Sequence, residues 1–275
     1  MIRPLVLFLS IALAAPAAAE PSGLEPLVRR DQMLGWEAVG RIDTGEGDGF
    51  CTGALIATDL VLTAAHCVYD RRGQPLDPGH MLFRAALAEG VALADAPVAV
   101  TVAHPGYDPA TPPSAQNVRH DVALLKLANP IPAALAAPFL VASPGTGDQV
   151  SVVSYALGRS EALSWQRSCD VLARQDGLVA MNCDVSFGSS GAPVLDRSDA
   201  RARIVSLISV GGVGGPDNEF VAYGMDLPQV VGDLKALLAR GKPLARAGTV
   251  PVGDPAALGA GTGKSRDIGA RFVTP

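Results

Sequence analysis

The sequence predicts an all-β fold that ends in a single helix. Short runs of apolar and β-branched residues alternate with Gly, Pro and Asp, which is the pattern of strands joined by turns. Only one segment, near the end of the chain, has helical periodicity. The chain has 275 residues, of which 48% are hydrophobic and 18% are charged, so it is long enough to bury one large core or two smaller ones.

The N-terminus has the features of a signal peptide over residues 1–19. A positively charged start precedes the apolar stretch PLVLFLSIALAA, which is short for a membrane span, and Ala17–Ala19 offers a small-residue cleavage site. The alternative is a retained membrane anchor. Residues 20–34 would follow as an N-terminal segment or pro-segment, in which Arg29-Arg30 marks a cleavage site or is simply a solvated basic pair. We expect export to the periplasm or the extracellular medium.

Four segments have the composition of strands: 50–62, 122–127, 150–157 and 204–210. Between the second and the third, residues 128–148 are rich in Pro, Ala and Gly. This stretch divides the strand-rich body into two halves and is long enough to cross between two domains.

The predicted helix covers residues 227–241, LPQVVGDLKALLARG. Its apolar residues recur at intervals of three and four, and Gly241 is a stop signal; they are Val230, Val231, Leu234, Leu237 and Leu238. Residues 242–275 have little periodicity and few large apolar side chains, so we expect a flexible tail.

The formal net charge of −5 makes nucleic acid and anionic lipid poor partners, and removal of residues 1–19 makes it one unit more negative. No cofactor motif is present. We expect a monomer that does not associate with membranes once the signal peptide has been removed.

The four cysteines form two local pairs, Cys51 with Cys67 and Cys169 with Cys183. Oxidising compartments favour disulfides, and neither a CxxC nor an HExxH spacing is present, so no metal site is predicted. A bond between Cys51 and Cys67 would close a loop of about fifteen residues, worth roughly 3 kcal/mol. It would also immobilise the neighbouring His66.

Three residues are candidates for chemistry. His66 closes the apolar run VLTAAH, where the simplest role is that of a core side chain. Asp121 opens an apolar segment, and a buried carboxylate needs a partner, which His66 could provide. Ser190 lies in DVSFGSSGAPVL, where glycines on both sides let backbone N–H groups approach an oxyanion, although such a loop can also be a plain hairpin.

At these residues the sequence resembles the trypsin-like (chymotrypsin-fold) serine proteases. TAAHC at 63–67, DVALLKL at 121–127 and GSSGAP at 188–193 are similar to the His, Asp and Ser motifs of that family, and they occur in the same order. The resemblance covers roughly residues 35–240. It implies two antiparallel six-stranded β-barrels packed face to face, at 35–135 and 136–241, with the C-terminal helix closing the second.

The resemblance also implies roles for single residues. His66 would be the general base, Asp121 its orienting carboxylate and Ser190 the nucleophile, acting on a protein or peptide substrate. The N–H groups of Gly188 and Ser190 would form the oxyanion hole. The positions that would bind substrate are Asp184, Ser209, Val210 and Gly211, and Ser209 would also support Asp121.

Two departures from the family concern activation and specificity. Ser189 replaces the aspartate that pairs with the new N-terminus of activated trypsins, so we expect no such switch and a closer resemblance to secreted bacterial relatives of the glutamyl endopeptidase type. Val185 and Ile208 replace the Thr and His that those enzymes use, which argues against a glutamate preference. Asp184 would select Arg or Lys, unless it faces solvent or caps a turn.

Two other function classes remain open at this stage. The chain could be a catalytically silent homologue that binds partners, or a hydrolase that acts on esters, although GxSxG is absent. His80, His104 and His120 have no matching motif and are interpreted as surface or packing residues.

Overall fold

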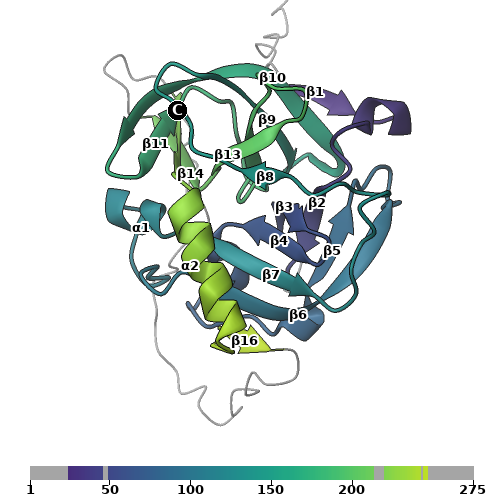
Figure 1. Ribbon diagram of the computed structural model, residues 1–275, viewed down its shortest axis with the longest axis vertical. Helices are drawn as coiled ribbons and strands as arrows, with labels where there is room; N and C mark the ends of the chain where they lie inside the picture. The colour runs from purple at the N-terminus through teal and green to yellow at the C-terminus, as the bar shows by residue number, and fades with distance from the viewer. Residues whose placement is uncertain (1–23, 46–48, 214–219, 243, 247–275) are drawn as a thin grey trace, which may run out of the picture.

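The computed structural model describes residues 24–45, 49–213, 220–242 and 244–246, as two β-rich halves that lie one above the other in Figure 1. The predicted signal peptide at 1–19 and the last part of the predicted tail, residues 247–275, lie outside the described residues. Among the described helices, none is both long and apolar enough to cross a membrane.

The first half is a closed six-stranded barrel. Its strands follow each other in the order β6-β5-β2-β3-β4-β7, and pairing of β6 with β7 closes the ring. They are β2 (Val39–Asp43), β3 (Phe50–Ala57), β4 (Leu60–Thr63), β5 (Leu82–Ala85), β6 (Ala94–Ala103) and β7 (Ala123–Leu127). The segment predicted as a strand at 50–62 is the hairpin of β3 and β4. The first predicted barrel is confirmed.

The second half is an open sheet, so the prediction of a second closed barrel is wrong. Its strand order is β14-β15-β11-β10-β9-β12-β13-β8, and no pairing joins β14 to β8 among the described residues. The strands are β8 (Leu140–Val141), β9 (Gln149–Ala156), β10 (Arg159–Gln175), β11 (Leu178–Met181), β12 (Pro193–Asp196), β13 (Arg203–Leu207), β14 (Val210–Val213) and β15 (Phe220–Met225). The two-residue strand β8, from the predicted crossover, pairs with the outer edge of β13. A closed barrel would require β14 to pair at this edge instead.

The larger hydrophobic core extends from the barrel into the second half. Phe83 and Leu125 of the barrel belong to the same buried cluster as Tyr155 and Leu163, which come from β9 and β10. The Tyr155 hydroxyl donates a hydrogen bond of 3.1 Å to the carbonyl of Leu87. The second half has a smaller core of its own, and the shared apolar surface fixes the two halves against each other.

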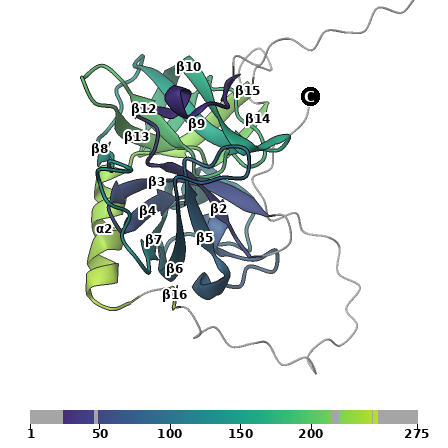
Figure 2. The same cartoon turned by 90° about the vertical axis from the view of Figure 1, so that its right-hand side faces the viewer.

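Helix α2 (Pro228–Ala239) packs on the first barrel, against β6 and β7, as Figure 2 shows from the side, and does not close the second half as expected. Val231 and Leu234 are its buried residues, and Pro228 occupies the first turn, where no backbone donor is lost. After α2 the chain forms β16 (Ala245–Arg246), which pairs with β6 and lies at the foot of Figure 1. Residues 245–246, in the segment expected to be a flexible tail, thus pair with the first barrel, and the flexibility of that segment stays a prediction.

The segment before the barrel connects both halves. Strand β1 (Leu24–Leu27) pairs with β10, and the short 3-10 helix η1 (Arg30–Met33) follows it. Arg30, one of the two basic residues considered as a cleavage site, donates hydrogen bonds to the carbonyls of Ala86 (2.7 Å) and Val91 (2.6 Å) in the first half. This segment, part of the region 20–34 expected to be N-terminal or a pro-segment, is integrated into the fold.

Replacement of Leu27 by alanine is expected to lower the free energy of unfolding by about 2–5 kcal/mol, the usual loss for a buried leucine. Leu27, in the strand that pairs with β10, is 3% exposed, whereas Leu34, seven residues later, is 73% exposed. Leu34→Ala is therefore the matched control, and its midpoint in urea should stay unchanged. Equal midpoints for the two variants, with equal m-values, would mean that β1 adds nothing to the folded protein.

Candidate active site

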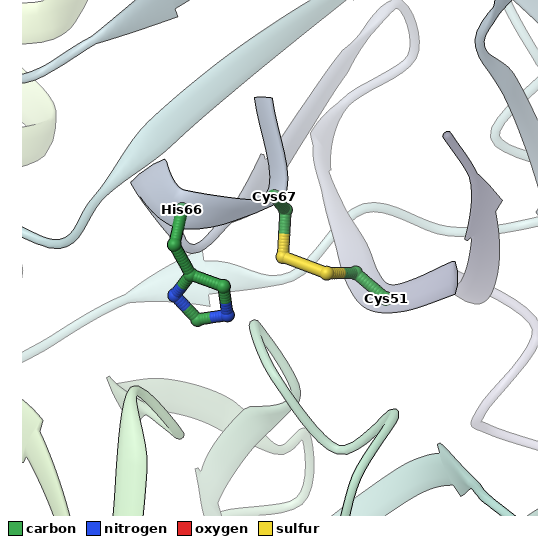
Figure 3. Close-up of side chains that lie close together, drawn as sticks. All are labelled: Cys51, His66 and Cys67. Carbon is green, nitrogen blue, oxygen red and sulfur yellow. A yellow bond between two sulfur atoms is a disulfide. The ribbon is translucent and has the colours of Figure 1, made fainter. Parts of the chain in front are cut away.

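His66 projects from a short 3-10 helix, η2 (Ala65–Val68), that follows strand β4. Figure 3 shows its ring pointing away from this turn, beside the disulfide that joins Cys67 to Cys51. The turn is therefore fixed on one side by the strand and on the other by a covalent bond. A catalytic base requires this rigidity, because small displacements of a reacting group are costly.

Asp121 holds the His66 residue by two hydrogen bonds. Its Oδ1 accepts a bond of 2.8 Å from the backbone N–H of His66, and its Oδ2 lies 2.8 Å from Nδ1 of the ring. The Ser209 hydroxyl donates a third bond, of 2.6 Å, to Oδ2. Asp121 follows helix α1 (Ala115–Arg119) and precedes β7, so it does not itself open the strand. Asp121 is 3% exposed, so its carboxylate is buried, and it takes part in all three of these hydrogen bonds.

The protonation of His66 is governed by opposing effects. Burial pushes the pKa of the imidazole down, but the negative charge of Asp121 and the hydrogen bond to it push the pKa up, and the net result is a pKa above the ordinary value of 6.5. A carboxylate on Nδ1 also fixes the tautomer in which that nitrogen carries the hydrogen. Nε2 of the neutral ring is then an acceptor.

Ser190 does not hydrogen-bond to His66 in this structure. Nε2 of His66 is buried and has no hydrogen-bond partner, and Ser190 is 5% exposed. Catalytic hydrogen bonds are often long or poorly aligned before substrate binds. The structure thus links His66 to Asp121 and Asp121 to Ser209 by hydrogen bonds. The expected hydrogen bond between Ser190 and His66 is not formed in it.

The loop that carries Ser190 is bonded to the first barrel through Thr52. The Thr52 N–H donates to the carbonyl of Ser190 (2.8 Å), and its hydroxyl donates to the carbonyl of Gly188 (2.9 Å). A Cβ on Gly191, whose φ is +75°, would collide with the Thr63 hydroxyl and the Thr52 carbonyl. Because Thr52 directly follows Cys51, these contacts place the serine loop against the segment that the disulfide ties to His66.

A hydrogen bond from the neighbouring turn fixes the peptide bond between Phe187 and Gly188. The N–H of Leu157, in the turn between β9 and β10, donates a 2.6 Å bond to the carbonyl of Phe187. In a trans peptide the carbonyl and the next N–H point in opposite directions, so this bond also sets the direction of the Gly188 N–H. Within the described chain, the N–H groups of Gly188 and Ser190 donate to no other protein group. Gly188 has φ of +91°, which favours glycine.

Ser189 occupies a buried position beneath this loop. Its hydroxyl lies 3.1 Å from the hydroxyl of Ser154 and 3.5 Å from the carbonyl of Tyr155, and its own N–H donates to Ser186 (3.0 Å). These neutral hydrogen bonds hold the loop without any charged group. A buried carboxylate here would need a cation, whereas a hydroxyl does not.

Both predicted disulfides are formed. Cys51 and Cys67 are joined with their Cα atoms 6.2 Å apart, and Cys169 and Cys183 with theirs 5.0 Å apart. The sulfurs of Cys51 and Cys67 and a ring nitrogen of His66 lie within 4.8 Å of one another. The two sulfurs are bonded to each other, so they offer no thiolate to a metal ion.

Removal of the Cys51–Cys67 bond by a double alanine substitution is expected to lower stability by about 3 kcal/mol and also to impair any activity that depends on His66. The Cys169–Cys183 pair is the matched control, since its separation of 14 residues is close to the 16 of the first pair. Denaturant unfolding should show similar losses for both variants. A similar fall in activity at a temperature where both are folded would contradict a special role for the first bond.

The predicted substrate-binding residues come from separate segments of the second half. Val210 and Gly211 are in β14, the edge strand, whereas Asp184 is half-buried and its N–H donates to Gln166 Oε1 (2.7 Å). Burial raises the pKa of the Asp184 carboxyl, and the positive charge of Arg159 opposes that rise. Asp184 is partly exposed, so its role in substrate binding stays a prediction. Val185 is 4% exposed, so it has little room to contact a substrate.

Sequence reasoning missed Thr52, Arg159 and Tyr107. Adjacency to Cys51 could have drawn attention to Thr52, but nothing local marks the other two. Tyr107 is near Asp121, whose charge, after burial, contributes to raising the pKa of the phenol. His104 and His120 stack on each other with ring centres 4.4 Å apart, which agrees with a packing role.

Comparisons with known proteins give the family and the fold. A family model described as a trypsin-like peptidase domain matches residues 51–202. The CLIP domain-containing serine protease HP8 of Bombyx mori is 36% identical over an alignment of 107 residues, and the match covers 34% of this chain and only 27% of that protein.

Two solved structures share the fold. A Glu endopeptidase in complex with MPD has a TM-score of 0.62 at 18% identity, covering 81% of this chain and 97% of that chain. Protease Anisep from Arthrobacter nicotinovorans has a TM-score of 0.59 at 19% identity, covering 74% and 96%. At such identities the likeness shows a common architecture. By the family model and by its chymotrypsin-like fold, the chain belongs to the trypsin-like peptidase family.

Proposed function

We propose that this protein is a secreted serine endopeptidase that hydrolyses peptide bonds through an acyl-enzyme. The observation that carries the proposal is the pair of hydrogen bonds from the His66 residue to Asp121, with Nε2 of the ring left as a buried acceptor without a partner. An unpartnered buried acceptor is unfavourable unless a donor reaches it at some stage. The Ser190 hydroxyl is the donor that we assign to it.

In the proposed reaction, Nε2 of His66 takes the proton of the Ser190 hydroxyl as Oγ attacks the carbonyl carbon of the substrate. The N–H groups of Gly188 and Ser190 donate to the oxyanion that forms. The imidazolium, stabilised by Asp121, then gives its proton to the leaving amine, and a water molecule hydrolyses the ester on Ser190. The free edge of β14, at Val210 and Gly211, would pair with the substrate backbone, as extended peptides do at an open sheet edge.

For specificity, we propose Asp184 as the group that recognises Arg or Lys before the scissile bond. Its half-buried carboxylate would form a charge-assisted hydrogen bond to a basic side chain. The buried hydroxyl contacts of Ser189 support a loop that is assembled without an N-terminal switch. The two disulfides are typical of oxidising compartments and support export after removal of residues 1–19.

Labelling with an active-site-directed phosphonate tests this function. We expect one covalent adduct on Ser190, located by peptide mass spectrometry, and none after His66→Ala. His80, which is exposed, provides a control, and His80→Ala should label like the parent. Labelling should occur on the full exported chain whether or not one extra residue remains at its mature N-terminus.

A second candidate is a catalytically silent homologue that binds partners through the same fold. In such a homologue the missing hydrogen bond between Ser190 and Nε2 of His66 would stay missing when a peptide binds, whereas in the peptidase it would form. Failure of the phosphonate to react with folded protein would support this candidate over the peptidase.

A further inference from the structure

The strongest unassigned feature is a charged pair that flanks the serine loop. Asp184 lies six residues before Ser190, and Arg159 lies just after the turn whose Leu157 N–H is bonded to Phe187 of the loop. Both charged residues are half-buried. The segment from Asp184 to Ser190 is thus bordered by a carboxylate and a guanidinium.

Arg159 has a guanidinium nitrogen that no acceptor among the described residues satisfies. Its Nη1 is buried and has no hydrogen-bond partner. Burial lowers the pKa of the guanidinium and the charge of Asp184 opposes this effect, but an arginine remains protonated in proteins. Two hydrogen bonds hold the segment of Asp184 against the hairpin that carries Arg159: the Asp184 N–H donates to Gln166 Oε1 of β10 (2.7 Å), and the Leu157 N–H donates to the Phe187 carbonyl (2.6 Å). A permanent, incompletely solvated positive charge therefore lies in the same region as the carboxylate.

The two charges are neighbours without being in contact. In the described structure, no guanidinium nitrogen of Arg159 lies within 4.0 Å of an Asp184 oxygen. No donor bonds to the carboxylate of Asp184 either. A side chain that reaches Asp184 would consequently enter the field of both charges.

We infer that Arg159 is a specificity-determining residue that opposes the binding of a basic substrate side chain at Asp184. The inference rests on the proposed peptidase function and refines its specificity. A cation that approaches Asp184 gains an opposite charge but is repelled by Arg159, whereas a neutral polar side chain can accept from Arg159 and donate to Asp184. The site then discriminates less between basic and neutral residues than Asp184 alone would.

Two peptide substrates that differ only in charge test this role. One has arginine before the scissile bond and the other citrulline, a neutral side chain of nearly the same shape. Arg159→Met is expected to raise the ratio of kcat/KM for arginine over citrulline by about tenfold or more, the scale of a like-charge repulsion in a partly buried site. Arg159→Lys retains the charge and should restore most of the parent ratio.

Two further variants complete the design. Arg201, which is exposed and bonds to the carbonyl of Pro138, is the matched arginine control, and Arg201→Met should leave the ratio unchanged. Adding Asp184→Asn to Arg159→Met should remove the gain, because no carboxylate is left to attract the arginine. Thermal unfolding of each variant checks that the fold is retained.

The outcomes distinguish the role of Arg159 in specificity from the peptidase function on which it rests. Phosphonate labelling of Ser190 with an unchanged ratio in folded Arg159→Met would overturn the inference and leave the peptidase function standing. A similar change in Arg201→Met would also overturn it, since a general charge effect would then be responsible. Absence of labelling and of hydrolysis in all variants would reject the peptidase function itself, and the inference with it.

Discussion

Replacement of His66 by alanine is expected to lower kcat by about a million-fold, as loss of the base does in enzymes that use a serine, a histidine and an aspartate as one unit. In the proposed mechanism the His66 ring takes the proton of Ser190, and its Nε2 is a buried acceptor without a partner among the described residues. Asp121 would remain buried with its bonds to Ser209 and to the backbone N–H of residue 66. The loss should therefore appear in the rate of the chemical step, with little change in KM.

The double variant separates a catalytic role from a structural one. If His66 and Ser190 act in one proton transfer, His66→Ala combined with Ser190→Ala should be hardly slower than either single variant. His80→Ala controls for the loss of a histidine, because His80 is exposed. More than a tenth of the parent kcat in folded His66→Ala, or multiplied losses in the double variant, would contradict the assignment.

Local sequence patterns predicted most of the strands named here, the helix α2 and the two disulfides. The apolar runs gave β3, β4, β7, β9 and most of β13, and the three-and-four spacing placed α2 to within two residues of each end. Strands and amphipathic helices are visible in short windows because their apolar faces repeat with fixed periods. The cysteine spacing likewise indicated the two disulfides, because each connects residues close in sequence.

Features that depend on distant partners were not predictable. Strand β1 is held by residues 163–166 of β10, and nothing in LEPL marks it as a strand. Closure of the second barrel was inferred from the family, but it depends on which strand reaches the free edge of β13, and that strand is the two-residue β8. The helix α2 was identified correctly, while the surface that it covers follows from tertiary packing alone.

The candidate site shows the same division. His66 and Asp121 were recognised from their motifs, and the structure adds that the carboxylate bonds both the ring and the backbone of His66. Arg159 has no motif and comes from a strand far from Asp184 in sequence, so its influence emerges only when the hairpin folds against the serine loop. Electrostatic neighbours of this kind are set by the tertiary fold and not by local spacing.

Replacement of Asp121 by asparagine is expected to lower kcat by about ten-thousand-fold and to displace the acidic limb of the pH profile. An amide can donate to Nδ1 and so stabilise the wrong tautomer of His66, and it cannot stabilise the imidazolium. Ser209→Ala is the graded control, since it removes one hydrogen bond of 2.6 Å from the carboxylate and keeps the charge. A loss of about tenfold is expected for it.

The sign of the pH shift follows from the balance at His66. Activity requires the neutral ring, so kcat/KM rises as the pH increases through the pKa of His66, and the raised pKa places this midpoint above 6.5 in the parent protein. Asp121→Asn removes both effects that raise the pKa and leaves burial, which lowers it. The midpoint should therefore move to lower pH in this variant and only slightly in Ser209→Ala. Profiles of kcat/KM between pH 4 and 9, with a neutral substrate, measure both midpoints, and an unmoved midpoint in Asp121→Asn would show that the titrating base is a group other than His66.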